Sequence, residues 1–372
     1  MMKLGFGLMR LPCKSADNSD IDINKTMELA DAFLAAGGTY FDTAYMYHGG
    51  KSEVAFRQAV VERYARDRFT VTDKLPIFQI TKAEEMQAIF EEQLQRCSVD
   101  FFDYYWLHAL GSESYQTAQR LNAFAFICEK KRLGLVRHVG FSFHDSPALL
   151  DRILTEHPEM EYVQLQINYL DWDDPTVCAR ECLEVAKKHN KPVIVMEPIK
   201  GGALANVPKD AEDLLHSQDP SRSIASWAMR FAASCDQVIM VLSGMGTMEQ
   251  MQDNLSYMKT FIPLNESEKQ AVMQAAELIR NSIAIPCTAC RYCVDGCPKH
   301  IAIPDYFAIY NNLKRYGESQ RVGAMTYYQN LRVNHGAPSD CIRCAKCENH
   351  CPQHLPIRAY LTQVEKELEH HK

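Results

Sequence analysis

The chain has 372 residues and a net charge of −7, and 47% of its residues are hydrophobic. No apolar run approaches the roughly 18 residues that a membrane span needs, and the negative charge does not suggest a nucleic-acid partner. The first residues, Met1 to Gly5, lack the apolar core of a signal peptide, so we expect a cytoplasmic protein.

Apolar runs and amphipathic segments alternate over residues 1–260. We predict strands at 4–9, 39–41, 69–72, 104–107, 136–142, 162–166, 192–196 and 238–242. We predict helices at 25–36, 53–64, 83–96, 115–131, 175–189 and 248–259, with another starting at 146–147 and helical segments running to 233. Eight strand–helix units without a long gap predict a (β/α)8 barrel. A doubly wound sheet is the alternative, but the first predicted strand is not followed by the glycine-rich helix opening typical of that fold.

The distribution of cysteines marks a second domain. Fourteen cysteines in a chain without an export signal argue against disulfides and for metal binding. Eight of them lie beyond Ile285. We therefore predict a barrel domain at 1–262, a helical linker at 263–286 and a cysteine-rich domain at 287–372.

Four polar residues lie at or just beyond the ends of successive predicted strands: Asp42, Tyr47, Lys74 and His108. In a parallel barrel the carboxyl ends of the strands meet at the catalytic face. A free tyrosine has a pKa of about 10, and a neighbouring ammonium lowers it. Asp42 would hold that ammonium in place, and His108 would orient a carbonyl, so that its oxygen is protonated while hydride reaches its carbon. The alternative is that each is a polar residue at a solvent-exposed edge.

The segments around these residues resemble the signature of the aldo-keto reductases. The matching motifs are Phe41-Asp42-Thr43-Ala44 with Tyr47 and Gly49…Ser52-Glu53, then Thr72-Asp73-Lys74, then Asp103-Tyr104-Tyr105-Trp106-Leu107-His108. That family is a (β/α)8 barrel that reduces aldehydes and ketones with NADPH. The resemblance implies Tyr47 as the general acid, Lys74 and Asp42 as the pair that tunes it, and His108 as the group that orients the carbonyl.

The resemblance extends in part to nucleotide contacts. Gly140-Phe141-Ser142-Phe143 and Gln164-Leu165-Gln166-Ile167-Asn168 resemble stretches that bind the nicotinamide amide, which implicates Ser142 and Gln164. Met196 stands where the family commonly stacks an aromatic side chain under nicotinamide. A thioether can cover a ring, but less rigidly than an aromatic side chain. Lys200 opens a glycine-containing loop that we expect to contact the pyrophosphate.

A second glycine turn precedes the last predicted barrel helix. It supplies Gly244, Gly246, Gln250 and Asn254 as candidate nucleotide contacts. The backbone of a glycine turn before a helix can hold phosphate. The resemblance implies NADPH as the cofactor. The Arg or Lys expected for the adenosine 2′-phosphate is missing, with Gln250 near its place, which keeps NADH as the alternative. His144, just past a strand end, is either a ligand contact or a loop histidine.

The cysteines beyond Ile285 form one motif twice. Each run has the spacing Cys-x2-Cys-x2-Cys-x3-Cys-Pro of bacterial ferredoxins. In that motif the fourth cysteine usually binds the other cluster. The predicted ligands are Cys287, Cys290, Cys293 and Cys351 for one [4Fe-4S] cluster and Cys341, Cys344, Cys347 and Cys297 for the other.

Structural zinc is the alternative, but zinc sites usually use separated Cys pairs or Cys with His. The long stretch between the two runs, with helices predicted at 306–316 and 324–332, indicates a mainly α-helical ferredoxin-like domain. The remaining cysteines, Cys13, Cys97, Cys128, Cys178, Cys182 and Cys235, are scattered. We expect small buried side chains there, although Cys178 and Cys182 are one helical turn apart and could chelate.

Two functions fit this sequence. The first is a carbonyl reductase acting on a small carbonyl substrate, with an attached two-cluster electron-transfer module. The second is an electron-transfer protein whose barrel is a docking or flavin-exchange site. A hydride carries two electrons, whereas a [4Fe-4S] cluster transfers one at a time. Coupling the two normally needs a flavin or another carrier that is stable as a radical, and no motif in this sequence indicates one. The clusters could instead serve a redox partner protein.

Overall fold

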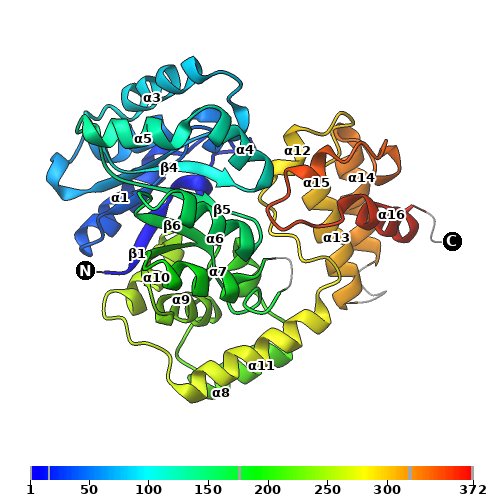
Figure 1. Cartoon of the computed structure of the whole chain (residues 1–372). Coiled ribbons are helices and arrows are strands. Elements are labelled where there is room, and N and C mark those ends of the chain that lie inside the picture. Colours follow the sequence, from blue (N-terminus) through cyan, green and yellow to red (C-terminus); the bar gives the residue numbers. More distant parts are fainter. Residues whose placement is uncertain (1, 16, 175–176, 317–320, 370–372) are drawn as a thin grey trace. The chain divides into compact units, whose positions relative to one another are not determined.

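The computed structural model describes residues 2–15, 17–174, 177–316 and 321–369. The chain divides into two compact units, which we describe separately (Figure 1). The barrel unit comprises Met1–Ile199 and Ala225–Lys269, and the C-terminal unit comprises Lys200–Ile224 and Gln270–Lys372. This division differs from the predicted boundaries at 262 and 286, because a segment after the seventh strand associates with the C-terminal unit.

The barrel unit is built on parallel strands that pair in sequence order and close between β8 and β1. The strands are β1 Leu4–Gly7, β2 Tyr40–Asp42, β3 Thr70–Leu75, β4 Phe102–Leu110, β5 Val136–Phe143, β6 Tyr162–Gln166, β7 Val193–Met196 and β8 Val238–Ser243. Every predicted strand is present, within three residues at each end. The predicted (β/α)8 barrel is therefore confirmed.

Strand periodicity explains how polar residues reach the carboxyl-end mouth of the barrel. Alternate side chains of a barrel strand point inward. Inside the barrel, Tyr40, Trp106, Ile194, Met240 and Leu242 form one buried cluster. The residues two positions further along β2, β4 and β7 share that inward face, one layer closer to the carboxyl ends. These are Asp42, His108 and Met196.

Helices surround these strands (Figure 1). The barrel unit contains α1 Ile23–Ala35, α2 Ser52–Phe56, α3 Ala83–Cys97, α4 Ser112–Arg120, α5 Ala123–Arg132, α6 Pro147–Glu156, α7 Ala179–Lys188, α9 Ile224–Ser234 and α10 Met248–Met258. Short 3-10 segments lie at η1 Leu8–Arg10, η2 Tyr47–Gly50, η4 Arg66–Arg68 and η5 Ile77–Gln79, and η3 Arg57–Val61 is a π-helical continuation of α2.

Two helix predictions differ from the structure in detail. The helix predicted at 115–131 is two helices, α4 and α5, because Asn122 between them adopts φ 54°, a left-handed conformation that Asn tolerates better than most residues. The helix predicted at 175–189 is observed as Ala179–Lys188, and its first two residues lie outside the described part of the chain.

The C-terminal unit is helical, as predicted. It contains η6 Lys200–Ala205, α8 Lys209–Gln218, α12 Tyr292–Asp295, α13 Ile303–Tyr316, α14 Arg321–Asn334, η8 Pro338–Asp340, α15 Lys346–Asn349, α16 Ile357–Leu368 and most of α11 Glu266–Ser282. Its core joins Phe307, Leu361 and Val364 with the buried cysteines Cys347 and Cys351. Among the described residues, no helix combines the length and apolarity needed to cross a membrane.

Candidate functional site

Lys74 lies at the centre of the predicted catalytic group. The register of β2 against β3 pairs Asp42 with Thr72, two residues before Lys74. Lys74 Nζ donates to Asp42 Oδ1 at 2.5 Å, to the Thr43 carbonyl at 2.7 Å and to the Tyr47 hydroxyl at 3.3 Å. The Lys74 side chain is fully buried. The structure thus brings Asp42, Tyr47 and Lys74 together in one hydrogen-bonded group.

The electrostatics of Tyr47 differ from our expectation. We expected Lys74 to lower the pKa of Tyr47. Instead, burial raises the pKa of the Tyr47 phenol well above its ordinary value, and the carboxylates of Asp42 and Glu197 add to this. Arg10 opposes the rise. The hydroxyl is therefore protonated at neutral pH, and the Lys74 contact at 3.3 Å is long for a hydrogen bond.

His108 follows Trp106 on the inward face of β4 and is also buried. Its ring lies edge-on to Tyr47, with centroids 5.9 Å apart, and Phe78 contacts it from another direction at 5.5 Å. Burial lowers the pKa of His108 well below its ordinary value, and the charges of Lys74 and His144 lower it further. Its Nδ1 is buried without a hydrogen-bond partner among the described residues. A neutral imidazole beside Tyr47 can act as a hydrogen-bond donor or acceptor to a ligand.

Two of the predicted nicotinamide contacts lie on the same inward face. Ser142 Oγ accepts a hydrogen bond from the Ala109 backbone N–H at 2.7 Å. Gln164 Nε2 donates to Asp42 Oδ2 at 3.2 Å. Both side chains are buried, and Gln164 ties the carboxylate that Lys74 contacts to strand β6. Met196 ends β7 and is partly exposed.

The predicted phosphate contacts have other partners. Lys200 Nζ donates to Gln353 Oε1 at 3.0 Å and is buried, so its side chain is engaged within the C-terminal unit. Gln250 Oε1 accepts from the Gly246 backbone at 2.8 Å. Asn254 is held by Ser243 Oγ at 2.7 Å and by the Tyr257 hydroxyl. A role for these residues in nucleotide binding remains a prediction.

Sequence reasoning missed an ion pair near Tyr47. Arg10 ends the turn after β1, and Glu197 follows β7. Their side chains lie 3.8 Å apart. Both charges act on Tyr47. Their positions just past strand ends were visible in the sequence, but no motif singled them out, and their pairing follows only from barrel closure.

Asp73, next to Lys74 in β3, forms a buried carboxyl pair with Glu53. Asp73 points away from the barrel interior, since it alternates with Lys74, and it is fully buried. Burial raises the pKa of Asp73 well above its ordinary value, and the neighbouring Glu53 raises it further. Arg96 donates to Glu53 Oε2 at 2.9 Å.

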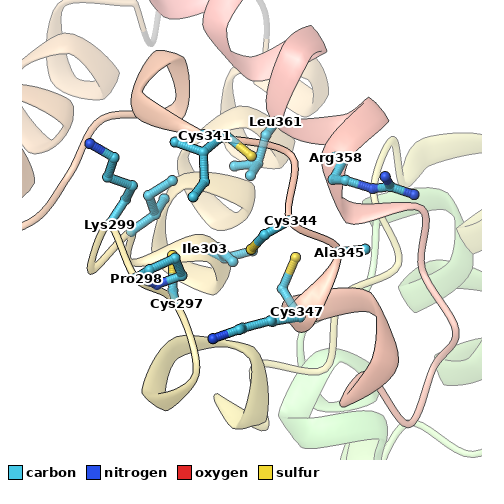
Figure 2. A pocket seen from close by; sticks show the side chains of 13 residues that line it. Cys297, Pro298, Lys299, Ile303, Cys341, Cys344, Ala345, Cys347, Arg358 and Leu361 are labelled. Carbon is cyan, nitrogen blue, oxygen red and sulfur yellow. The ribbon is translucent and has the colours of Figure 1, made fainter.

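The eight motif cysteines of the C-terminal unit surround two pockets. Pocket A is lined by Cys287, Cys290, Cys293 and Cys351 together with Gln353 and other residues. Pocket B is lined by Cys297, Cys341, Cys344 and Cys347 (Figure 2). In each pocket three cysteines of one run meet the fourth of the other. The structure thus brings together the two ligand sets that the spacing predicts.

The remaining cysteines lie apart from these pockets. No three His, Cys, Asp or Glu side chains in the described residues converge tightly enough to share a single metal ion. In pockets A and B the sulfurs instead line the wall of a cavity. Cys182 is buried and Cys178 is partly exposed at the start of α7. Cys97 is buried against Asp73, with its sulfur 3.8 Å from Oδ2.

Comparison with known proteins identifies both parts of the chain. Residues 3–277 match the family model for the aldo/keto reductase family, which covers more than half of the chain. The chain belongs to the aldo/keto reductase family. Residues 286–355 match the model for a 4Fe-4S dicluster domain. The protein is therefore an oxidoreductase of this family that carries an iron–sulfur dicluster domain.

Individual relatives of this aldo/keto reductase are distant. The NADH-specific methylglyoxal reductase of Escherichia coli is 22% identical over 322 residues, covering 75% of this chain and 96% of that protein. An uncharacterized oxidoreductase of Bacillus subtilis is 21% identical over 262 residues, covering 62% of this chain and 81% of the relative.

Solved structures support the fold of this aldo/keto reductase. The holo form of an aldo-keto reductase from Bacillus halodurans matches with a TM-score of 0.60 and 22% identity, covering 73% of this chain and 91% of that one. An aldo/keto reductase from Klebsiella pneumoniae in complex with NADP and acetate matches with a TM-score of 0.57 and 19% identity, covering 74% and 91%. At these identities the likeness concerns the barrel alone.

Proposed function

We propose that the barrel reduces the carbonyl group of a small aldehyde or ketone, with Tyr47 as the general acid. The observation that carries this proposal is the three-way contact of the buried Lys74 ammonium with Asp42, the Thr43 carbonyl and the Tyr47 hydroxyl. A buried ion pair adds little stability, because the cost of removing two charges from water offsets much of their attraction. An apolar core would stabilise the fold better, so this group points to a chemical role.

In this mechanism the substrate carbonyl oxygen lies between Tyr47 and His108. A nicotinamide dinucleotide supplies the hydride to the carbonyl carbon when it is bound. The Tyr47 hydroxyl donates its proton to the carbonyl oxygen, and the resulting phenolate is held by the Lys74 ammonium until it is reprotonated. His108 stays neutral, so its ring donates a hydrogen bond that polarises the carbonyl without adding a charge.

The groups around this site fit a primary carboxamide such as that of nicotinamide. Ser142 Oγ accepts from the backbone of Ala109 and keeps its own hydrogen to donate. Gln164 uses its amide nitrogen for Asp42 and keeps its oxygen to accept. One donor and one acceptor complement an amide. We propose NADPH or NADH as the cofactor, and the named activity of the E. coli relative makes methylglyoxal with NADH the first pair to test.

We further propose that pockets A and B each hold a [4Fe-4S] cluster. Four thiolates line each pocket, and Cys347 and Cys351 are buried in the core of the C-terminal unit. Thiolates are the ligands that such clusters use. The clusters supply one-electron transfer when present, which fits exchange with a redox partner protein.

Replacement of Tyr47 by Phe tests the barrel reaction. The variant keeps the ring and loses the proton, so we expect kcat/KM with aldehydes to fall at least ~100-fold, the usual contribution of a general acid. Tyr45→Phe is the control, because that hydroxyl donates to Glu92 at 2.8 Å instead of facing the site. Retained turnover in Tyr47→Phe would remove Tyr47 from the acid role.

A second candidate is an electron-transfer protein with little carbonyl reductase activity. The observation that favours it is that Lys200 and Asn254, two expected nucleotide contacts, already have protein partners. Anaerobic titration with NADPH and NADH separates the two functions. Bleaching of the cluster absorbance without aldehyde turnover would support the second candidate, whereas turnover with unchanged clusters would support the first.

A further inference from the structure

Lys200 is a buried cation whose amine contacts a residue in the lining of pocket A. It opens η6, a segment that belongs to the C-terminal unit although it follows β7 in the chain. The residue is 3% exposed, and its amine donates to Gln353 Oε1 at 3.0 Å. Gln353 is itself 4% exposed, lines pocket A and stands two residues after Cys351. The buried Lys200 ammonium is thus hydrogen-bonded to a residue that lines one cysteine pocket.

The charge of Lys200 acts on two of the four cysteines of pocket A. Lys200 is close enough to Cys287 for its charge to act on that side chain. Its charge also acts on Cys351, which faces backbone N–H groups at 353–355 and lies two residues before Gln353, the hydrogen-bond partner of Lys200. A charge that is removed from water interacts more strongly with its neighbours than an exposed charge does.

No cation that lines pocket B is buried, and Arg291, which lines pocket A, is exposed and paired with Asp305 at 3.0 Å. Lys299 and Lys346 are exposed, so solvent and salt screen their charges. Arg358 is paired with Glu348 at 2.7 Å, which cancels most of its charge. Cys344 of this pocket is also exposed, whereas no cysteine of pocket A is. The two pockets therefore place their contents in unlike electrostatic surroundings.

We propose that Lys200 raises the reduction potential of the cluster in pocket A above that of the cluster in pocket B. This inference rests on the proposed function, because it requires that both pockets bind clusters. Each reduction adds one negative charge, and a nearby buried cation stabilises the reduced form more than the oxidised form. Net charge, hydrogen bonds to sulfur and solvent exposure are the properties that set the potentials of such clusters.

Replacement of Lys200 by Met tests this inference in the full-length protein prepared without oxygen. Both potentials are measured by redox titration with mediators, followed by electron paramagnetic resonance. We expect the higher potential to fall in Lys200→Met, with about a tenfold smaller ratio of reduced to oxidised cluster at a fixed potential, or about 59 mV for one electron. The lower potential should stay unchanged.

Two variants control for effects other than charge. Lys200→Arg keeps the charge and should retain the wild-type potentials. Lys209→Met removes an exposed charge from α8 of the same unit and should shift neither potential. The inference is overturned if both potentials are unchanged in Lys200→Met, if both shift equally, or if Lys200→Arg shifts as far as Lys200→Met.

Iron and acid-labile sulfide are measured first, so that the two proposals fail separately. Wild-type protein that lacks iron after anaerobic preparation contradicts cluster binding itself. Wild-type protein with two clusters of equal potential contradicts only the role of Lys200. Loss of iron confined to Lys200→Met shows a role in assembly, which contradicts the proposed role, and Lys200→Arg then reports whether charge is needed for it.

Discussion

The buried pair of Asp42 and Lys74 gives a prediction that can be tested by a double-mutant cycle. Lys74→Met leaves the Asp42 carboxylate with Gln164 as its remaining partner, at 3.2 Å. Asp42→Asn leaves the Lys74 ammonium without its counter-charge. Removing one partner of a buried ion pair usually costs about 3–5 kcal/mol, because the other charge stays buried and uncompensated. We expect each single variant to lose stability within this range.

The double variant, Asp42→Asn with Lys74→Met, should lose far less than the sum of the two single variants. No uncompensated charge remains in it, and replacing a whole buried pair is often close to neutral. We therefore expect a coupling energy of at least about 2 kcal/mol. All three variants should lose aldehyde reduction, because the proton donor loses the cation that holds its phenolate.

The assay is urea unfolding under anaerobic conditions, followed by tryptophan fluorescence with Trp106 as a probe inside the barrel. An exposed pair provides the control cycle. Arg132 and Glu129 lie 2.6 Å apart on α5, with side chains 69% and 47% exposed. Such a pair should couple by less than about 1 kcal/mol. Additive losses for Asp42 and Lys74 would refute our account of the pair.

Three further predictions concern pH and iron. The pKa of Asp73 is raised in the folded state, so the folded protein keeps a proton that the unfolded chain releases above pH 3.8. Between pH 3.8 and the raised pKa, the free energy of unfolding therefore falls as the pH rises, by up to about 1.4 kcal/mol per pH unit. Asp73→Asn should flatten this slope, and an unchanged slope in urea midpoints from pH 5 to 8 would argue against it. The lowered pKa of His108 keeps its ring neutral, so the pH–rate profile should show no ionisation of His108 near pH 6.5. An ionisation near pH 6.5 that is present in the wild type and absent in His108→Gln would contradict this. Removing iron with a chelator should expose the C-terminal unit to proteases and spare the barrel unit, since Cys347 lies in the former's core.

The barrel and the group around Lys74 could be predicted because local sequence determines them. Apolar runs of strand length mark each strand, and a polar residue at the end of a run must lie at the carboxyl edge of a parallel barrel. Asp42 and His108 needed only that argument. The grouping of the cysteines could be predicted as well, because in two runs of equal spacing the fourth cysteine of each run usually binds the other cluster.

Other features could not be predicted because they depend on contacts between distant segments. Arg10 and Glu197 meet only because β8 closes on β1, which brings the ends of the chain's first and seventh strands to one mouth. The rise in the pKa of Tyr47 depends on burial, which no motif encodes. Lys200 and Gln353 are 153 positions apart, and no motif in either segment predicts their contact.

The position of Lys200 changes how the second domain is understood. A boundary drawn from composition treats the cysteine-rich domain as an appendage that begins near residue 287. The C-terminal unit instead includes Lys200–Ile224. This segment connects β7 to α9 in the sequence of the barrel domain, but it belongs to the unit that holds the cysteine pockets. The resemblance implied that Lys200 contacts the pyrophosphate, whereas in the structure its amine is hydrogen-bonded to Gln353, which lines pocket A. For Lys200 to bind a nucleotide phosphate as well, its amine would have to exchange this partner, so the two roles compete for one ammonium.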